Sequence, residues 1–89
     1  MQAIGDIEDI TNHESLVATH RMEITQDDDT FVLKVEVWER ASDGQLFGKH
    51  YCDDQPWKDL PWTAGKSPEE VVRSAIGFAK ERARVRPGT

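Results

Sequence analysis

The chain has little of what marks several common functional classes. Its 89 residues include one cysteine, Cys52, which excludes an internal disulfide. No apolar run approaches the ~20 residues that a membrane-spanning helix needs. The first residues, MQAIGDIEDI, are acidic, whereas a secretory signal begins with a basic region that leads into an apolar one. These absences predict no membrane segment, no secretory signal and a reducing, cytoplasmic location.

Positive charge is also scarce. With 17 acidic and 11 basic residues, the formal net charge is −6. Because neutralisation of phosphates by Lys and Arg supplies most non-specific affinity for nucleic acids, this balance argues against a general nucleic-acid binder. The charge is uneven: residues 1–60 hold 14 acids and 5 bases, and residues 61–89 hold 3 acids and 6 bases. The length suits one domain with one hydrophobic core.

Alternating hydrophobicity is the main pattern that the chain does contain. Apolar and polar residues alternate over 16–24 and again over 31–40, and a third strand is expected at 45–52. Two four-residue loops, 27–30 and 41–44, would join these strands into an antiparallel meander. This register places Ile24, Leu33 and Cys52 in one row of an apolar inner face. It also places Glu23, Lys34 and Tyr51, and likewise Arg21, Glu36 and Lys49, in charged rows of the outer face.

A helix over 68–85 is the clearest local prediction. Ser67 is expected to cap it, Pro68 suits the first helical position, and Glu70 completes a capping box. The fold class is therefore α+β, a three-stranded antiparallel β-meander with a C-terminal helix packed on one face, in the order βββα. Isoleucines at every third position, Ile4, Ile7 and Ile10, make residues 1–15 an N-terminal arm or a short helix. Residues 16–86 form the single domain, and residues 87–89 are a tail.

Residue types that carry catalysis or bind metals are present, but their spacing favours structural roles. Gly65-Lys66-Ser67 lacks the first glycine of a phosphate-binding loop, so it is interpreted as a helix cap. His20 and His50 lie two strands apart, about 10 Å at backbone level, which is too far for a shared zinc ion. Cys52 is predicted to face inward, where a thiol is inert. We therefore expect no enzyme activity, no metal and no cofactor.

The stretch DDQPWKDLPWTAGK, residues 53–66, repeats Pro-Trp at a five-residue interval and follows neither a helical nor a strand period. Connections of this length are usually functional or partly disordered. Trp57 and Trp62 could plug an open end of the core or form a binding surface, and the sequence leaves both open. Trp38 and Phe47 are expected on the outer sheet face, where no remaining element is long enough to cover them.

These aromatic residues predict a small, non-catalytic protein-interaction or regulatory module. Its partner is another protein or a second copy of the chain. The predicted partner-binding residues are Trp38, Phe47, Trp57, Trp62, Arg21 and Lys49.

Nucleic-acid binding by the outer sheet face is the alternative. A three-stranded sheet supported by one helix resembles the topology of plant AP2-type domains and phage-integrase arm domains. The resemblance covers architecture alone; in this alternative, Arg21, Lys34, Arg40 and Lys49 of the outer face would contact phosphates and bases. Glu23, Glu36 and Glu39 on the same strands weigh against this alternative.

Overall fold

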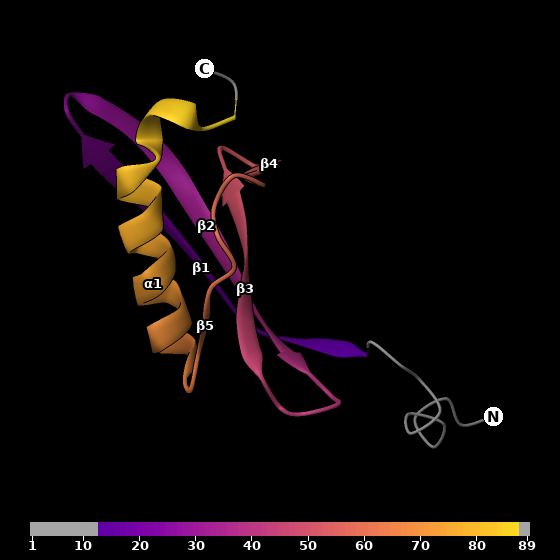
Figure 1. Ribbon diagram of the computed structural model, residues 1–89. Helices are drawn as coiled ribbons and strands as arrows, with labels where there is room; N and C mark the ends of the chain where they lie inside the picture. Colours follow the sequence, from indigo (N-terminus) through magenta and orange to yellow (C-terminus); the bar gives the residue numbers. More distant parts are fainter. Residues whose placement is uncertain (1–12, 88–89) are drawn as a thin grey trace.

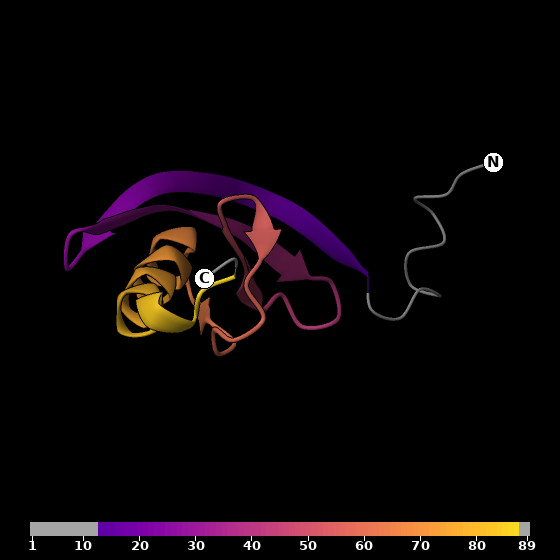
Figure 2. The same ribbon diagram turned by 90° about the horizontal axis from the view of Figure 1, so that it is seen from above.

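A curved antiparallel sheet with one helix on its concave side makes up the computed structural model, which describes residues 13–87 (Figures 1 and 2). The elements are β1 (Glu14–Gln26), β2 (Asp29–Arg40), β3 (Leu46–Cys52), β4 (Gln55–Pro56), β5 (Ala64–Gly65), α1 (Pro68–Glu81) and the 3₁₀ helix η2 (Ala83–Val85). The strands are ordered β1-β2-β3-β4, and β5 also pairs with β3. The predicted α+β class and βββα order are confirmed.

The pairing of β2 with β3 has the predicted register. Leu33 pairs with Cys52 and Trp38 pairs with Phe47. The backbone N–H of Arg40 donates to the carbonyl of Gln45 at 2.9 Å, which closes the four-residue loop between them. Gly44 lies in that loop with a φ of 72°, a left-handed conformation that glycine adopts without a steric penalty.

The predicted pairing of β1 with β2 is wrong by two residues. Asp27 and Asp28 have φ values of 54° and 68°, so these two residues alone form the turn. Two consecutive left-handed residues match the twist of a hairpin, and aspartate tolerates that conformation better than most residues. Ile24 consequently pairs with Phe31 instead of Leu33. A shift of two preserves the faces, but it changes every cross-strand partner.

The charged rows predicted for the outer face change accordingly. Arg21 lies opposite Lys34, and Thr19 lies opposite Glu36. The β2–β3 half of each row, such as Glu36 opposite Lys49, is retained.

The segment 53–66 contains more regular structure than its sequence suggests. Asp53 and Asp54 form a second two-residue turn, with φ values of 49° and 70°. This turn folds the chain back so that β4 pairs with the end of β3, and β5 pairs with the start of β3. The segment therefore follows the edge of β3 along much of its length.

Helix α1 begins as predicted and ends earlier. The Oγ of Ser67 accepts a hydrogen bond from the backbone N–H of Glu70 at 3.3 Å. The α-helical turns stop at Glu81, and a 3₁₀ helix continues to Val85. The small residues Ala75 and Ala79 are fully buried against the sheet.

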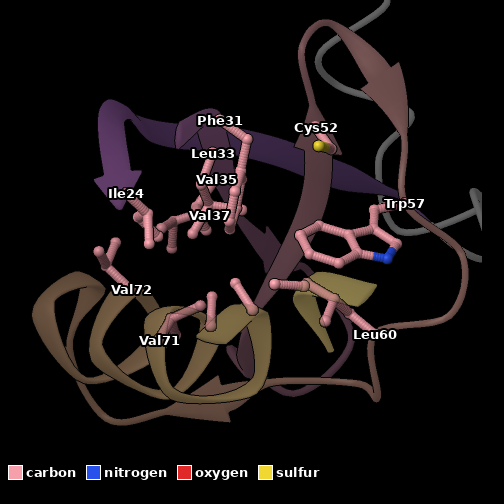
Figure 3. Packing of buried hydrophobic residues seen from close by; sticks show 13 residues of the cluster. Ile24, Phe31, Leu33, Val35, Val37, Cys52, Trp57, Leu60, Val71 and Val72 are labelled. Atoms are coloured by element: carbon pink, nitrogen blue, oxygen red, sulfur yellow. The ribbon is translucent and has the colours of Figure 1, made fainter. Parts of the chain in front are cut away.

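The hydrophobic core lies between α1 and the concave face of the sheet (Figure 3). It consists of Ile24, Phe31, Leu33, Val35, Val37, Cys52, Trp57, Leu60, Val71, Val72, Ala75, Ala79 and Ala83. Gly48 has no side chain at the point where β3 approaches α1, and a Cβ there would lie 2.9 Å from Cγ1 of Val71. Strand β3 and α1 therefore approach each other closely at Gly48.

The predicted N-terminal arm or short helix falls mainly on residues 1–12, which lie outside the described residues. Residues 14 and 15, which were assigned to that arm, belong to β1. Of the predicted tail, 87–89, only Pro87 is described. Within residues 13–87, no helix is long and apolar enough to cross a membrane.

Candidate interaction site

The two Pro-Trp tryptophans have opposite environments. Trp57 is 2% exposed, and its ring meets the ring of Phe31 edge-on, with centroids 5.7 Å apart and an interplanar angle of 84°. Trp62 is 59% exposed and stacks on Phe47, with centroids 6.3 Å apart. Trp57 therefore plugs the core, and Trp62 presents an aromatic surface to solvent.

Phe47 is not the exposed aromatic that its strand position predicts. It pairs with Trp38 and so shares the outer face with it, but it is only 7% exposed. The ring of Trp62 covers it, which the sequence could not indicate because Trp62 is 15 residues further along the chain. Phe47 is therefore a buried ring on which Trp62 stacks.

Trp38 is half-buried within a polar network on the outer face. Its indole Nε1 donates to Oε1 of Glu36 at 3.2 Å, and the hydroxyl of Tyr51 donates to the same oxygen at 3.1 Å. The Nζ of Lys49 lies 4.2 Å from the centroid of the Trp38 ring and 3.2 Å from Oε1 of Glu14. The indole of Trp38 is thus occupied by contacts within the chain.

The tyrosine in this network is held in its protonated form. Burial, followed by the hydrogen bond and the negative charge of Glu36, raises the pKa of Tyr51. A neutral phenol keeps its proton and can continue to donate to the carboxylate.

Two arginines of the outer face contact carboxylates, and Lys34 lies 4.5 Å from the centroid of the Tyr51 ring. Arg21 contacts Asp54 with an N–O distance of 2.8 Å, and Arg40 contacts Asp43 at the same distance. The hydrogen bond from Arg21 lowers the pKa of Asp54, so that carboxylate stays charged at neutral pH. These acids reduce the positive potential that nucleic-acid binding by this face would require.

A cleft of about 430 Å³ lies between β3 and the segment 53–66. We call it the Pro-Trp cleft. Its lining includes Tyr51, Pro56, Trp57, Lys58, Leu60 and Trp62, together with Gly48, Lys49 and His50 of β3. Aromatic rings and one proline make its surface mainly apolar, and Lys58 adds a positive charge.

The indole nitrogen of Trp57 lacks a hydrogen-bond partner. Its Nε1 is buried, and no described residue accepts from it. Figure 3 shows this nitrogen on the side of the ring that is turned away from Phe31 and Leu33. Buried indole N–H groups usually find an acceptor, so Trp57 is an exception to the usual satisfaction of buried polar groups.

His50 lies at the inner end of the Pro-Trp cleft, where it is buried. Its Nε2 is 2.8 Å from Oγ1 of Thr63, a side chain that is also buried. Burial lowers the pKa of His50, because desolvation penalises the imidazolium. The histidine is neutral at physiological pH and holds the segment 53–66 against β3.

We expect the protein to lose stability as pH falls below about 6.5, the ordinary histidine pKa in an unfolded chain. His50 has a lowered pKa in the folded state, so the unfolded state binds more protons in this window. Its contribution to stability is complete above that pH, and it declines by up to about 1.4 kcal/mol per pH unit on acidification. Urea denaturation at pH 8, 6.5 and 5.5 would measure this decline.

His50→Gln is the matched control for that measurement, because glutamine can still bond Thr63 but does not titrate. Its stability should change less between pH 8 and pH 5.5 than that of the wild type. Equal slopes in the two proteins would assign the effect to other groups.

The cysteine and the possible metal ligands show no arrangement that indicates catalysis or metal binding within residues 13–87. Cys52 is fully buried, and burial raises the pKa of its thiol, so the reactive thiolate is disfavoured. Within residues 13–87, His, Cys, Asp and Glu side chains form no group of three that could hold a metal ion.

Three of the six predicted site residues line the Pro-Trp cleft: Lys49, Trp57 and Trp62. Trp38 and Arg21 are not among its lining residues, and Phe47 lies beneath Trp62. Pro56, Lys58 and Leu60 also line the cleft and were not among the predicted site residues. The repeated Pro-Trp pair was a usable signal, because Pro56 belongs to it and the other two residues lie between its copies. Comparisons with protein-family models, with curated proteins and with solved structures returned no match.

Proposed function

We propose that this chain is a non-catalytic protein-interaction module that binds an extended segment of another protein in the Pro-Trp cleft. The observation that carries the proposal is Trp62, which is 59% exposed at the rim of the cleft and stacked on the buried ring of Phe47. An aromatic side chain that is already fixed loses little conformational entropy on binding. Such residues are frequent binding hot spots.

The lining of the cleft indicates what the partner segment would contain. Grooves lined by aromatic residues accept extended, proline-rich peptides, whose conformation is largely formed before binding. Lys58 favours acidic residues beside the apolar anchor, since rim charges steer partners of opposite sign.

Buried residues support the proposed absence of catalysis and the proposed compartment. The neutral His50 and the buried thiol of Cys52 support a structural role, which fits a module without catalysis. A free cysteine also suits the reducing, cytoplasmic compartment that we propose. Nucleic-acid binding gains no support from an outer face whose arginines contact carboxylates.

Peptide display tests this function. Random peptides selected on the wild-type protein should be enriched in proline, aromatic and acidic residues. Their affinity should fall about 10-fold or more with Trp62→Ala, because hot-spot truncations commonly cost ~2 kcal/mol or more. Titration calorimetry with the selected peptides would measure the change.

Two variants make the result specific. Trp62→Phe keeps a ring on Phe47 and should retain part of the affinity, and Lys58→Glu should weaken acidic peptides more than neutral ones. The proposal fails if no peptide is enriched, or if the selected peptides bind Trp62→Ala as tightly as the wild type.

A further inference from the structure

Strand β1 is a long edge of the sheet, and no other strand within residues 13–87 pairs with its outer side. Its 13 residues pair only with β2 among the described elements (Figure 2), and Leu16 and Val17 are 51% and 47% exposed. An edge strand presents unpaired N–H and C=O groups to any chain that can pair with them, and proline, lysine and bulges are the usual protection. Strand β1 contains neither proline nor lysine, and its one irregularity lies between Leu16 and Ala18.

The hydrogen bonds of β2 show which residues of β1 face this edge. The carbonyl of Val32 accepts from the N–H of Asp53, so the backbone groups of Val32 point toward β3. Its partner Glu23 must then point its own groups away from β2, because facing residues in an antiparallel pair alternate between bonded and non-bonded positions. The same alternation turns the backbone groups of Thr19, Arg21, Glu23 and Thr25 outward.

We propose that this edge pairs with the same edge of a second copy of the chain. The two β1 strands run antiparallel, with Arg21 of each copy opposite Glu23 of the other and Met22 next to the two-fold axis. Thr19 and Thr25 of opposite copies form the flanking pairs. The two sheets become one continuous sheet with both α1 helices on the same side.

Charge complementarity selects the second copy and this register. When the pairing shifts by two residues in either direction, so that the axis moves from Met22 to a neighbouring residue, Arg21 faces its own counterpart or Glu23 faces its own. Like charges directly opposite are destabilising in a sheet. The proposed register instead forms two Arg–Glu pairs from residues two apart in one strand, a self-complementary arrangement that a two-fold interface requires.

The surface below the edge has room for the partner side chains. A groove of about 280 Å³ lies between β1 and α1, lined by Met22, Ile24, Ile76 and Lys80, together with Glu23 and Thr25. Met22 and Ile76 are only partly buried against the core. In the dimer, Met22 of the second copy would pack next to these residues and cover them.

The ion pair between Arg21 and Asp54 does not prevent this pairing. Both side chains are more than half exposed. Exposed pairs of this kind are weak and exchange partners readily.

Charge reversal in the 89-residue chain tests the register. Arg21→Glu or Glu23→Arg alone places like charges opposite each other twice, and each should weaken dimerisation about 10-fold or more. Mixing the two single variants should restore a dimer, because every Arg–Glu pair is then re-formed between unlike chains. The double variant should dimerise by itself. Sedimentation velocity over a range of concentrations would measure each equilibrium.

Several outcomes would overturn the proposal. A wild type that stays monomeric at millimolar concentration, single variants that dimerise like the wild type, or a mixture that does not assemble would each do so. Circular dichroism of each variant would test whether the fold is intact. Formation of the mixed dimer is a second check, because it requires both variants to be folded. Trp62→Ala is the control for the separate Pro-Trp cleft and should leave the dimer unchanged.

Amide exchange gives a second, mutation-free test. The N–H groups of Thr19, Arg21, Glu23 and Thr25 should become protected as protein concentration rises, as measured by residue-resolved hydrogen exchange. Protection of these four amides under conditions where sedimentation shows a monomer would mean that a segment of the same chain covers the edge, and it would overturn the dimer. Exchange that is fast at every concentration would do the same.

Discussion

Trp57→Ala is expected to remove most of the protein's stability. The indole is 2% exposed and packs edge-on against Phe31 at the end of the core. Truncation of a buried tryptophan loses the transfer free energy of the ring and leaves a cavity, which together cost about 3–5 kcal/mol. Typical domains have about 5–15 kcal/mol in total, and small ones lie toward the low end. We therefore expect a largely unfolded or molten population at 37 °C.

Trp62→Ala is the matched control, since it makes the same substitution five residues further along the same segment. Trp62 is 59% exposed, so its loss should cost about 1 kcal/mol or less, mainly through uncovering Phe47. Urea denaturation followed by far-ultraviolet circular dichroism would measure both changes. Equal losses in the two variants would contradict the assignment of one tryptophan to the core and the other to the surface.

The sequence could not separate these two residues, because each follows a proline in the same polar segment. The difference arises from the turn at Asp53 and Asp54, which brings the backbone N–H of Trp57 to 2.9 Å from the carbonyl of His50. That bond fixes the chain direction at Trp57 and places its ring over the open end of the core. A long-range contact of this kind leaves no periodic signal.

Elements with strong local signals were predictable. The cap at Ser67 and the apolar stripe that includes Val71 and Ala75 depend on residues three or four positions apart, and the helix begins where they indicate. The β2–β3 register was equally accessible, because the loop at 41–44 fixes which residues pair. In these cases the information lies within one turn or one hairpin.

The β1–β2 register was missed because turn length decides it, and two turns were compatible with the alternating pattern. Both give Ile24 an inward position, so hydrophobicity could not choose between them. The deciding feature is the left-handed backbone of Asp27 and Asp28. The pair Asp53 and Asp54 adopts the same conformation, so two adjacent aspartates mark a tight hairpin twice in this chain.

The candidate surfaces were located only in part for a related reason. The sequence indicated aromatic residues, but burial depends on what covers them, and Trp62 covers Phe47 from another part of the chain. The structure instead places the Pro-Trp cleft beside β3 and the outer edge of the sheet on β1, with β2 between them. A dimer formed through β1 would leave both clefts free, so two partner segments could bind the same assembly.

Gly48→Ala is expected to be the second most damaging of these substitutions, although it adds one methyl group. A Cβ at this position would lie 2.6 Å from Oγ1 of Thr63 and 2.9 Å from Cγ1 of Val71. Both neighbours are buried, and rotation of Thr63 would break its contact with His50. Overpacking of this kind costs about 1–3 kcal/mol, which outweighs the ~0.5–1 kcal/mol that alanine gains over glycine within a strand.

Gly77→Ala is the same substitution at another position, and it is expected to raise the free energy of unfolding where Gly48→Ala lowers it. Gly77 is an exposed residue of α1, and a Cβ there would meet nothing within 4 Å. Alanine should therefore stabilise the helix by about 0.8–1 kcal/mol, the difference in helix propensity. Thermal denaturation of the two variants would give shifts in opposite directions. If Gly48→Ala were as stable as the wild type, α1 could not pack as closely on β3 as the structure shows.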